Sequence, residues 1–152
     1  MTMPIGSVFC DTNIVLRSSL EEIPEHAQVR AAIGWLHDSG TELWISRQII
    51  REFCAVLTRP QTFTRPLPSA TVLQLARALP TSYRVADETA EVTTALLALL
   101  DTIPCGGKQV HDANIVATMR AYGIGQLLTL NAADFRRFTP LIAVLAPEEV
   151  MR

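Results

Sequence analysis

The sequence predicts an α/β fold in which short apolar strands alternate with amphipathic helices around a mainly parallel sheet. Three observations support this fold class. Short apolar runs recur along the chain, helical patterns separate them, and 49% of the 152 residues are hydrophobic while 18% are charged. A chain of this length can bury a core without disulfides, and alternating strands and helices are typical of a sheet covered on both faces. We therefore expect a single three-layer α/β/α domain over residues 1–152.

The first predicted strand is the apolar run that ends at Cys10, directly before Asp11. Val8 and Phe9 are typical of a buried strand, and the carboxylate follows where such a strand reaches the rim of its sheet. Ligands bind at the carboxyl ends of the strands in open parallel sheets, so Asp11 is a candidate site residue. On local grounds alone, an Asx turn between Asp11 and Asn13 explains the same carboxylate.

The N-terminal half of the chain then predicts three helices and a second strand. In order, these are a short helix or turn at residues 13–20, a helix at about 24–37, a strand at 43–45 and a helix at about 47–58. Ser39 and Gly40 end the second helix in the expected manner, and Ser46 is a good N-cap for the third. Three prolines between residues 59 and 68 predict an irregular loop.

The C-terminal half repeats the alternation. The predicted elements are a helix from Ser69 to about Leu79, a strand at 83–85, a helix from Asp87 to Leu100, a helix from Asp112, a strand at 126–130, a helical turn at 131–135 and a last strand at 141–145. Gly106 and Gly107 lie in the break before the Asp112 helix, and Gly123 and Gly125 flank its end. No internal repeat or long linker divides the chain.

Two further acids have positions that bring them toward Asp11. Glu52 borders the apolar stripe of its helix, level with Val56, so its side chain is partly sheltered. Asp112 begins a helix in line with the buried stripe that includes Ile115. In a parallel sheet each crossover returns the chain to the same edge, so strand ends and helix starts gather at one rim. Asp11, Glu52 and Asp112 are therefore expected to meet there.

Carboxylates that crowd together repel one another and must either bind protons or hold a cation. A ligand set made only of oxygens selects Mg²⁺ or Mn²⁺, and such an ion suits chemistry on phosphate groups. Taken singly, the acids also have structural explanations. In these explanations Glu52 pairs with Arg59 or faces water, Asp112 is an N-cap or a first-turn acid favoured by the helix dipole, and Asn131 with Asp134 forms a helix start.

Charge and cysteine content limit the classes of function. The net charge is −2, with Lys108 as the only lysine, so binding to nucleic acid would need a local basic patch or a metal ion. The cysteines, which are Cys10, Cys54 and Cys105, form no close pair and are typical of a reducing compartment. No apolar run approaches membrane-spanning length and no secretory leader is apparent, so we expect a soluble, cytoplasmic protein without a membrane partner.

Other phosphate-handling classes fit the sequence poorly. A haloacid dehalogenase-like phosphatase requires a second aspartate two residues after Asp11, where Asn13 stands, and a receiver domain requires an acid pair at the end of its first strand. Neither a G-x-G-x-x-G nor a G-x-x-x-x-G-K-[ST] loop is present, which argues against a nucleotide-binding fold.

Four segments together carry a resemblance to a known family. These segments are Phe9–Asn13, Ser46–Phe53, Val110–Ala117 and Leu128–Phe135. In order and spacing they resemble the four acidic motifs of the PIN domain, and nearly the whole chain is most similar to the VapC-type toxins of bacterial toxin–antitoxin pairs. The resemblance implies a Mg²⁺- or Mn²⁺-dependent endoribonuclease of the cytoplasm. It also implies a homodimer that is neutralised by a small antitoxin bound across the active site.

The resemblance also implies roles for individual residues. Asp11, Glu52 and Asp112 would be catalytic metal ligands, directly or through water. Thr12 and Asn13 would support Asp11, and Thr129 would lie beside the fourth acidic position. Many relatives have an acid where this chain has Asn131, so Asp134 is expected to supply the fourth carboxylate, with Asn131 as a neutral oxygen ligand or a water-positioning group. Because of this departure, the number of metal ions, one or two, stays open.

The implied reaction is hydrolysis of an RNA phosphodiester by a metal-activated water, which leaves a 5′-phosphate and a 3′-hydroxyl. Arg17, Arg47 and Arg51 are candidate phosphate contacts, or ordinary surface charges. His111 adjoins Asp112 and either meets the substrate or is structural. The alternative function is a PIN fold that binds RNA or a protein without cutting, which the missing acid at Asn131 favours.

Overall fold

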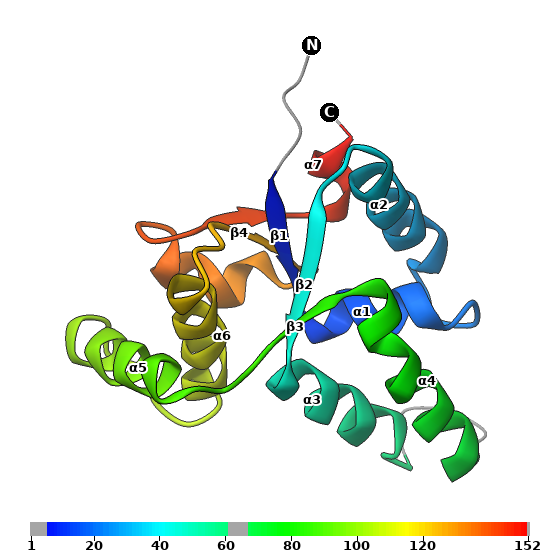
Figure 1. Ribbon diagram of the computed structural model, residues 1–152, viewed down its shortest axis with the longest axis horizontal. Helices are drawn as coiled ribbons and strands as arrows, with labels where there is room; N and C mark the ends of the chain where they lie inside the picture. Colours follow the sequence, from blue (N-terminus) through cyan, green and yellow to red (C-terminus); the bar gives the residue numbers. More distant parts are fainter. Residues whose placement is uncertain (1–5, 61–66, 152) are drawn as a thin grey trace.

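The structure is a computed structural model that describes residues 6–60 and 67–151, and Figure 1 shows its strands at the centre with helices around them. The strands of the described part are β1 (Ser7–Cys10), β2 (Glu42–Ser46), β3 (Arg84–Ala86), β4 (Gln126–Leu128) and β5 (Ala143–Leu145). They form one sheet in the order β3-β2-β1-β4-β5, and each neighbouring pair is parallel.

Helices cover both faces of this sheet. They are α1 (Thr12–Ser19), α2 (His26–Asp38), α3 (Arg47–Leu57), α4 (Ser69–Ser82), α5 (Ala90–Thr102), α6 (Gln109–Ala121), the 3-10 helix η1 (Ala132–Phe138) and α7 (Pro147–Val150). In Figure 1, α5 and α6 lie on one side of the strands, and α1, α2 and α4 lie on the other. The predicted three-layer α/β/α fold class with a mainly parallel sheet is confirmed.

The strand order places the end of β1 at the point where the direction of winding reverses. The chain runs from β1 outward through β2 to β3, and then returns to the other side of β1 for β4 and β5. Clefts form at such a reversal because the connections on either side of it lead away from each other. Asp11, which follows β1, donates its backbone N–H to the carbonyl of Leu128 at the end of β4, at 3.0 Å. Asp11 therefore lies at this switch point.

The position of β1 in the core explains why its sequence is a continuous apolar run. Val8, Phe9 and Cys10 have no exposed surface, because helices cover both faces of this central strand. Phe53 from α3 and Phe135 from η1 are also fully buried. The first strand is thus held rigidly, and it fixes the position of the carboxylate that follows it.

Two helix starts differ from the sequence prediction. The helix expected from Asp87 begins at Ala90, because the Thr89 side chain caps it by accepting the backbone N–H of Val92 at 3.3 Å. Asp87 instead forms an ion pair with Arg47. Similarly, α6 begins at Gln109, so Asp112 lies in its first turn and does not begin the helix.

Helix and strand ends also differ in detail. Helix α4 continues through Pro80 to Ser82, past the expected end, and the last two strands are shorter than their apolar runs. Ser46 occupies the predicted N-cap position of α3, but its buried hydroxyl has no hydrogen-bond partner among the residues that the structure describes. Most of the proline-rich loop predicted at 59–68 lies outside the described residues. Within the described ranges, no helix is both long and apolar enough to cross a membrane.

Candidate active site

The acids predicted to converge line one cavity of about 780 Å³ at the carboxyl edge of the sheet. Its lining includes all four predicted carboxylates, which are Asp11, Glu52, Asp112 and Asp134. They come from four places in the chain: the end of β1, the middle of α3, the first turn of α6 and η1. The fold therefore brings together side chains that lie far apart in sequence.

Asp11 is the most firmly held of these acids. Its carboxylate accepts the backbone N–H of Thr12 at 2.8 Å, the hydroxyl of Thr129 at 2.8 Å and the amide of Asn13 at 3.3 Å. Only 8% of the residue is exposed. Because two donors from the start of α1 and one that follows β4 fix it, the carboxylate has one orientation, with a small face toward the cavity.

Asn13 and Thr129 join the two central strand ends. The Asn13 side chain donates to the Thr129 hydroxyl at 3.3 Å and accepts the backbone N–H of Leu130 at 3.0 Å. The Thr129 hydroxyl also accepts the backbone N–H of Asn131 at 3.0 Å. These contacts place the fourth motif beside Asp11. Asn13 and Thr129 therefore contact both Asp11 and each other.

Glu52 is held by two donors that the sequence prediction did not pair with it. The Thr12 hydroxyl donates to its carboxylate at 2.6 Å, and the Gln48 amide donates at 3.0 Å. Glu52 does not pair with Arg59, which was one of the open alternatives. Thr12 therefore supports Asp11 through its backbone N–H and Glu52 through its hydroxyl, so it links two of the carboxylates.

Gln48 is the functional candidate that the sequence analysis missed. Its side chain is buried, with 3% of the residue exposed, and it donates to the His111 carbonyl at 2.9 Å as well as to Glu52. Its own carbonyl accepts the amide of Asn114 at 2.7 Å. Gln48 thus ties α3 to the first turn of α6, where Asp112 lies. The sequence feature that could have identified Gln48 is its position one helical turn before Glu52, among residues of the apolar face.

Asp112 and Asp134 are less constrained. Asp112 is half-buried, and no side chain or backbone group of the described residues donates a hydrogen bond to its carboxylate. Asp134 is exposed on η1, and Asn131 lies beside it on the cavity lining. The half-buried, unpaired carboxylate of Asp112 is the acid that would benefit most from a cation.

The acids influence one another electrostatically. Burial raises the pKa of Asp11, and the hydrogen bonds from Thr129 and Thr12 oppose this rise, while the charges of Glu52 and Asp134 add to it. Burial also raises the pKa of Asp112 to about 6, with further increases from Asp11, Asp134 and Glu52. Nearby negative charges disfavour ionisation of Asp11 and Asp112, as is typical of a site that binds protons or a cation.

The donor chemistry of the cavity fits a hard divalent cation. Its acids offer only oxygen ligands, and their mutual repulsion is the kind that Mg²⁺ or Mn²⁺ relieves. Within residues 6–60 and 67–151, no three acidic, histidine or cysteine side chains surround a common point as a ready-made metal site. The acids therefore share a cavity without forming a closed set of metal ligands.

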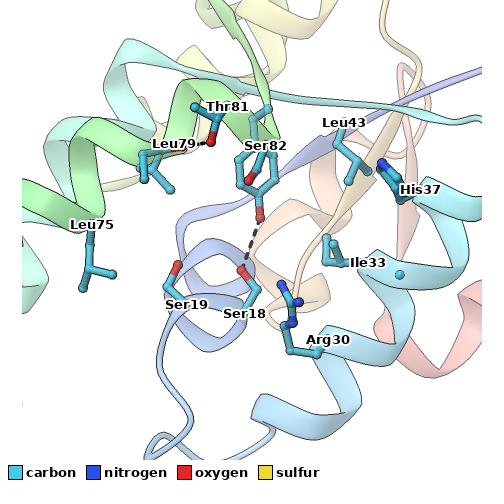
Figure 2. A pocket seen from close by; sticks show the side chains of 13 residues that line it. Ser18, Ser19, Arg30, Ile33, His37, Leu43, Leu75, Leu79, Thr81 and Ser82 are labelled. Atoms are coloured by element: carbon cyan, nitrogen blue, oxygen red, sulfur yellow. Dashed lines mark hydrogen bonds between the residues drawn. The ribbon is translucent and has the colours of Figure 1, made fainter.

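A second cavity, of about 440 Å³, lies between α1, α2, α4 and β2, and Figure 2 shows it from close by. Its side chains include Ser18 and Ser19 from α1, Arg30 and His37 from α2, and Leu75 and Leu79 from α4. Its described lining contains no carboxylate. It therefore lacks the oxygen ligands that the first cavity provides, and it is not the candidate active site.

The raised pKa of Asp112 predicts a dependence of stability on pH. Because its pKa in the folded protein is about 6, above the usual 3.8, the folded state holds this proton more tightly than the unfolded chain. Ionised Asp112 therefore destabilises the metal-free protein as the pH rises from about 4 to above 6. Asp112→Asn is expected to stabilise the protein in EDTA at pH 7.5 by about 1 kcal/mol, after discounting for solvent screening.

Thermal unfolding in EDTA at pH 7.5 and pH 4.5 measures this effect. The variant should melt a few degrees higher than the wild type at pH 7.5, and the gain should largely disappear at pH 4.5. Asp101→Asn, at an exposed acid near the end of α5, is the matched control and should leave the melting temperature unchanged. An equal gain at both pH values would contradict the assignment of the effect to ionised Asp112.

Comparison with known proteins gives the family of this fold. The family model described as PIN domain matches residues 8–139. Ribonuclease VapC24 of Mycobacterium tuberculosis is 26% identical over 131 residues, which cover 84% of this chain and 88% of that protein.

Solved structures agree on the fold at lower sequence identity. VapBC2 from Rickettsia felis, bound to a DNA fragment from its promoter, superposes with a TM-score of 0.69 at 15% identity and covers 92% of this chain and 98% of that chain. VapC20 of Mycobacterium tuberculosis, described as a sarcin-ricin loop cleaving toxin, gives a TM-score of 0.63 at 17% identity, with 90% and 96% covered. Because the family model spans the chain from β1 to just beyond η1, this protein belongs to the PIN domain family.

Proposed function

We propose that this protein is a metal-dependent endoribonuclease and the toxin of a type II toxin–antitoxin pair. The observation that carries the proposal is the meeting of Asp11, Glu52, Asp112 and Asp134 in one cavity at the switch point of a PIN fold. The relative Ribonuclease VapC24 supports RNA as the substrate, and the likeness to VapC20, described as a sarcin-ricin loop cleaving toxin, supports a toxin that cuts.

The four acids would bind Mg²⁺ or Mn²⁺, and the residues around them would hold them in place. When bound, such an ion lowers the pKa of water and neutralises charge on a phosphate oxygen. The hydrogen bonds from Thr129 and Thr12 oppose the rise in the pKa of Asp11 that burial causes, because each of them favours the charged form. Thr12 and Gln48 orient Glu52 toward the same cavity. The product ends would be a 5′-phosphate and a 3′-hydroxyl.

For the fourth position we propose Asp134 as the charged group and Asn131 as a neutral neighbour. The charge of Asp134 raises the pKa of both Asp11 and Asp112, so it acts on the same site. Asn131 lines the cavity but adds no negative charge. Asn131 stands where many relatives have an acid. This missing acid is the observation that favours the second candidate function, a non-catalytic PIN fold that binds RNA or protein.

We further propose a protein antitoxin as partner, a homodimer, and a cytoplasmic location. The likeness to structures of VapBC2 from Rickettsia felis and of VapBC-1 from Haemophilus influenzae supports the antitoxin. The homodimer is proposed from the membership of the chain in the PIN domain family, whose members are commonly homodimers.

Incubation of the purified protein with total cellular RNA tests the proposed function. RNA should be cut with Mg²⁺ or Mn²⁺ and remain intact with EDTA, and adding excess Mg²⁺ after EDTA should restore cutting, because the acids need the ion to act. Calorimetric titration with Mn²⁺ gives an independent readout of the site. Intact RNA in every sample, together with no metal binding, would contradict the nuclease and favour the binding module.

A further inference from the structure

The cavity that holds the four acids is also lined by four arginine and lysine residues, which differ in the groups that they contact. They are Arg17, Arg51, Arg59 and Lys108. A basic residue that already pairs with an acid of the protein must break that pair before it can hold a substrate phosphate. A basic residue without a partner has no such cost. The contacts of these four residues therefore indicate which of them are available to a substrate.

Two of the four are committed to acids that lie outside the cavity lining. Arg17 donates to Glu25 at 2.7 Å. Arg51 donates to both carboxylate oxygens of Glu88, at 3.0 and 2.9 Å, and this contact raises the pKa of Arg51. A guanidinium that makes a two-bond contact with a carboxylate is well satisfied in place. Arg47, the third arginine considered from the sequence, pairs with Asp87 and is absent from the cavity lining.

Arg59 and Lys108 have no such partner. Neither side chain forms a hydrogen bond or an ion pair with any group in the described part of the chain, and both are exposed. Arg59 follows the C-cap of α3, and Lys108 directly precedes α6. These are the two helices that carry Glu52 and Asp112. The uncommitted positive charges therefore lie on the same walls as two of the acids.

Three of the four acids are less exposed than these two bases, while Asp134 is exposed as they are. Asp11 is buried, Glu52 and Asp112 are half-buried, and Arg59 and Lys108 are exposed at the rim. An RNA chain carries a negative phosphate at each nucleotide. When one phosphate of the RNA reaches the acids together with a cation, the neighbouring phosphates of the same RNA strand would lie near the rim. With a net charge of −2, the protein has no general positive field, so such neighbours must be held by local charges.

We propose that Lys108 and Arg59 bind the RNA backbone phosphates that flank the cleavage position. The proposal rests on the proposed function, because it takes RNA as the substrate of this cavity. It assigns phosphate binding to two residues that the sequence analysis did not name as phosphate contacts. It also removes this role from Arg17, Arg47 and Arg51, which the sequence analysis did name. Both residues act as positioning residues, since they hold the backbone and take no part in proton transfer.

The test measures RNA binding by the wild-type protein in EDTA, so that binding is separated from cutting. The probe is a fluorescein-labelled, mixed-sequence single-stranded RNA of about 12 nucleotides, a length that single-strand-binding sites commonly cover. Fluorescence anisotropy gives the affinity from about 20 to about 200 mM KCl, and a gel confirms that the RNA is intact. The variants are Lys108→Ala, Arg59→Ala and the pair together, with Arg47→Ala as the control of equal charge change.

Each single variant should weaken binding about threefold to tenfold and lower the slope of log affinity against log salt by about 0.7, with the two losses adding in the pair. Lys108→Arg should retain affinity, and Arg47→Ala should stay within about twofold of the wild type. The proposal is overturned if Arg47→Ala weakens binding as much as Lys108→Ala, or if the double variant binds like the wild type.

The outcome for this proposal is distinguishable from that for the proposed function. Binding that depends on Lys108 and Arg59, in a protein that leaves RNA intact with Mg²⁺, would support the phosphate contacts and contradict the nuclease. Cutting with Mg²⁺ that is unaffected by the double variant, with equal affinity in EDTA, would support the nuclease and contradict the phosphate contacts.

Discussion

Asp11→Asn is expected to abolish metal-dependent RNA cleavage, with a loss of about 1000-fold or more, while the protein stays folded. The substitution removes one negative charge from the most buried of the four acids and changes the side-chain volume very little. Asp11 lies at the switch point of the sheet, and three donors fix its carboxylate toward the cavity. No other acid of the site is held in this way, so none can replace its charge there.

The fold should tolerate this change because burial already favours the neutral form of Asp11. Its pKa is raised, so removing the charge also removes an electrostatic cost of folding in the absence of metal. The amide keeps an oxygen that can accept the backbone N–H of Thr12. A melting temperature in EDTA that is equal to or above that of the wild type is therefore expected.

The measurement is the rate of total-RNA cleavage with Mg²⁺, beside the melting temperature and the circular dichroism of each protein. Asp101→Asn is the matched control, since it removes the same charge from an exposed position outside the cavity lining, and it should cut at the wild-type rate. Undiminished cleavage by a folded Asp11→Asn protein would place the chemistry elsewhere and contradict the proposed metal site.

Gln48→Leu is expected to lower stability by about 2 to 4 kcal/mol and to weaken metal binding at least tenfold. Leucine keeps roughly the size of the side chain but removes its donors and its acceptor. The His111 carbonyl and the Asn114 amide would then lose their partner in a partly buried setting, and Glu52 would lose one of its two donors. Unpaired polar groups in such a place carry the full cost of lost hydration.

Urea unfolding and calorimetric titration with Mn²⁺ separate the two parts of this effect. Gln74→Leu, at an exposed position on α4, provides the control for replacing a helical glutamine and should change neither quantity by much. Gln48→Glu tests the amide more finely, because it keeps the shape but places a second acid beside Glu52. Metal affinity of Gln48→Leu equal to the wild type would show that Gln48 stabilises the fold without positioning Glu52.

Local patterns were sufficient to predict most elements, because each depends on neighbours in the sequence. The buried run before Asp11 and the apolar faces of α3 and α6 follow directly from the spacing of hydrophobic residues. The boundaries that differed depend on competing contacts. Asp87 does not begin α5, since Arg47 and Tyr122 bind it from other parts of the chain, and Thr89 supplies the cap.

By itself, the sequence determined the α/β class, the parallel sheet and the expected meeting of Asp11, Glu52 and Asp112 at one edge, because hydrophobic periodicity and crossover rules depend only on residue order. Asp134 joined this set only through the resemblance to the PIN domain. Only the tertiary structure decided which polar groups hold those acids. The contact of Gln48 with His111, the link from Thr12 to Glu52 and the ion pair of Arg51 with Glu88 join residues distant in sequence. Such pairings depend on distances of a few ångströms between elements, which one-dimensional patterns do not encode.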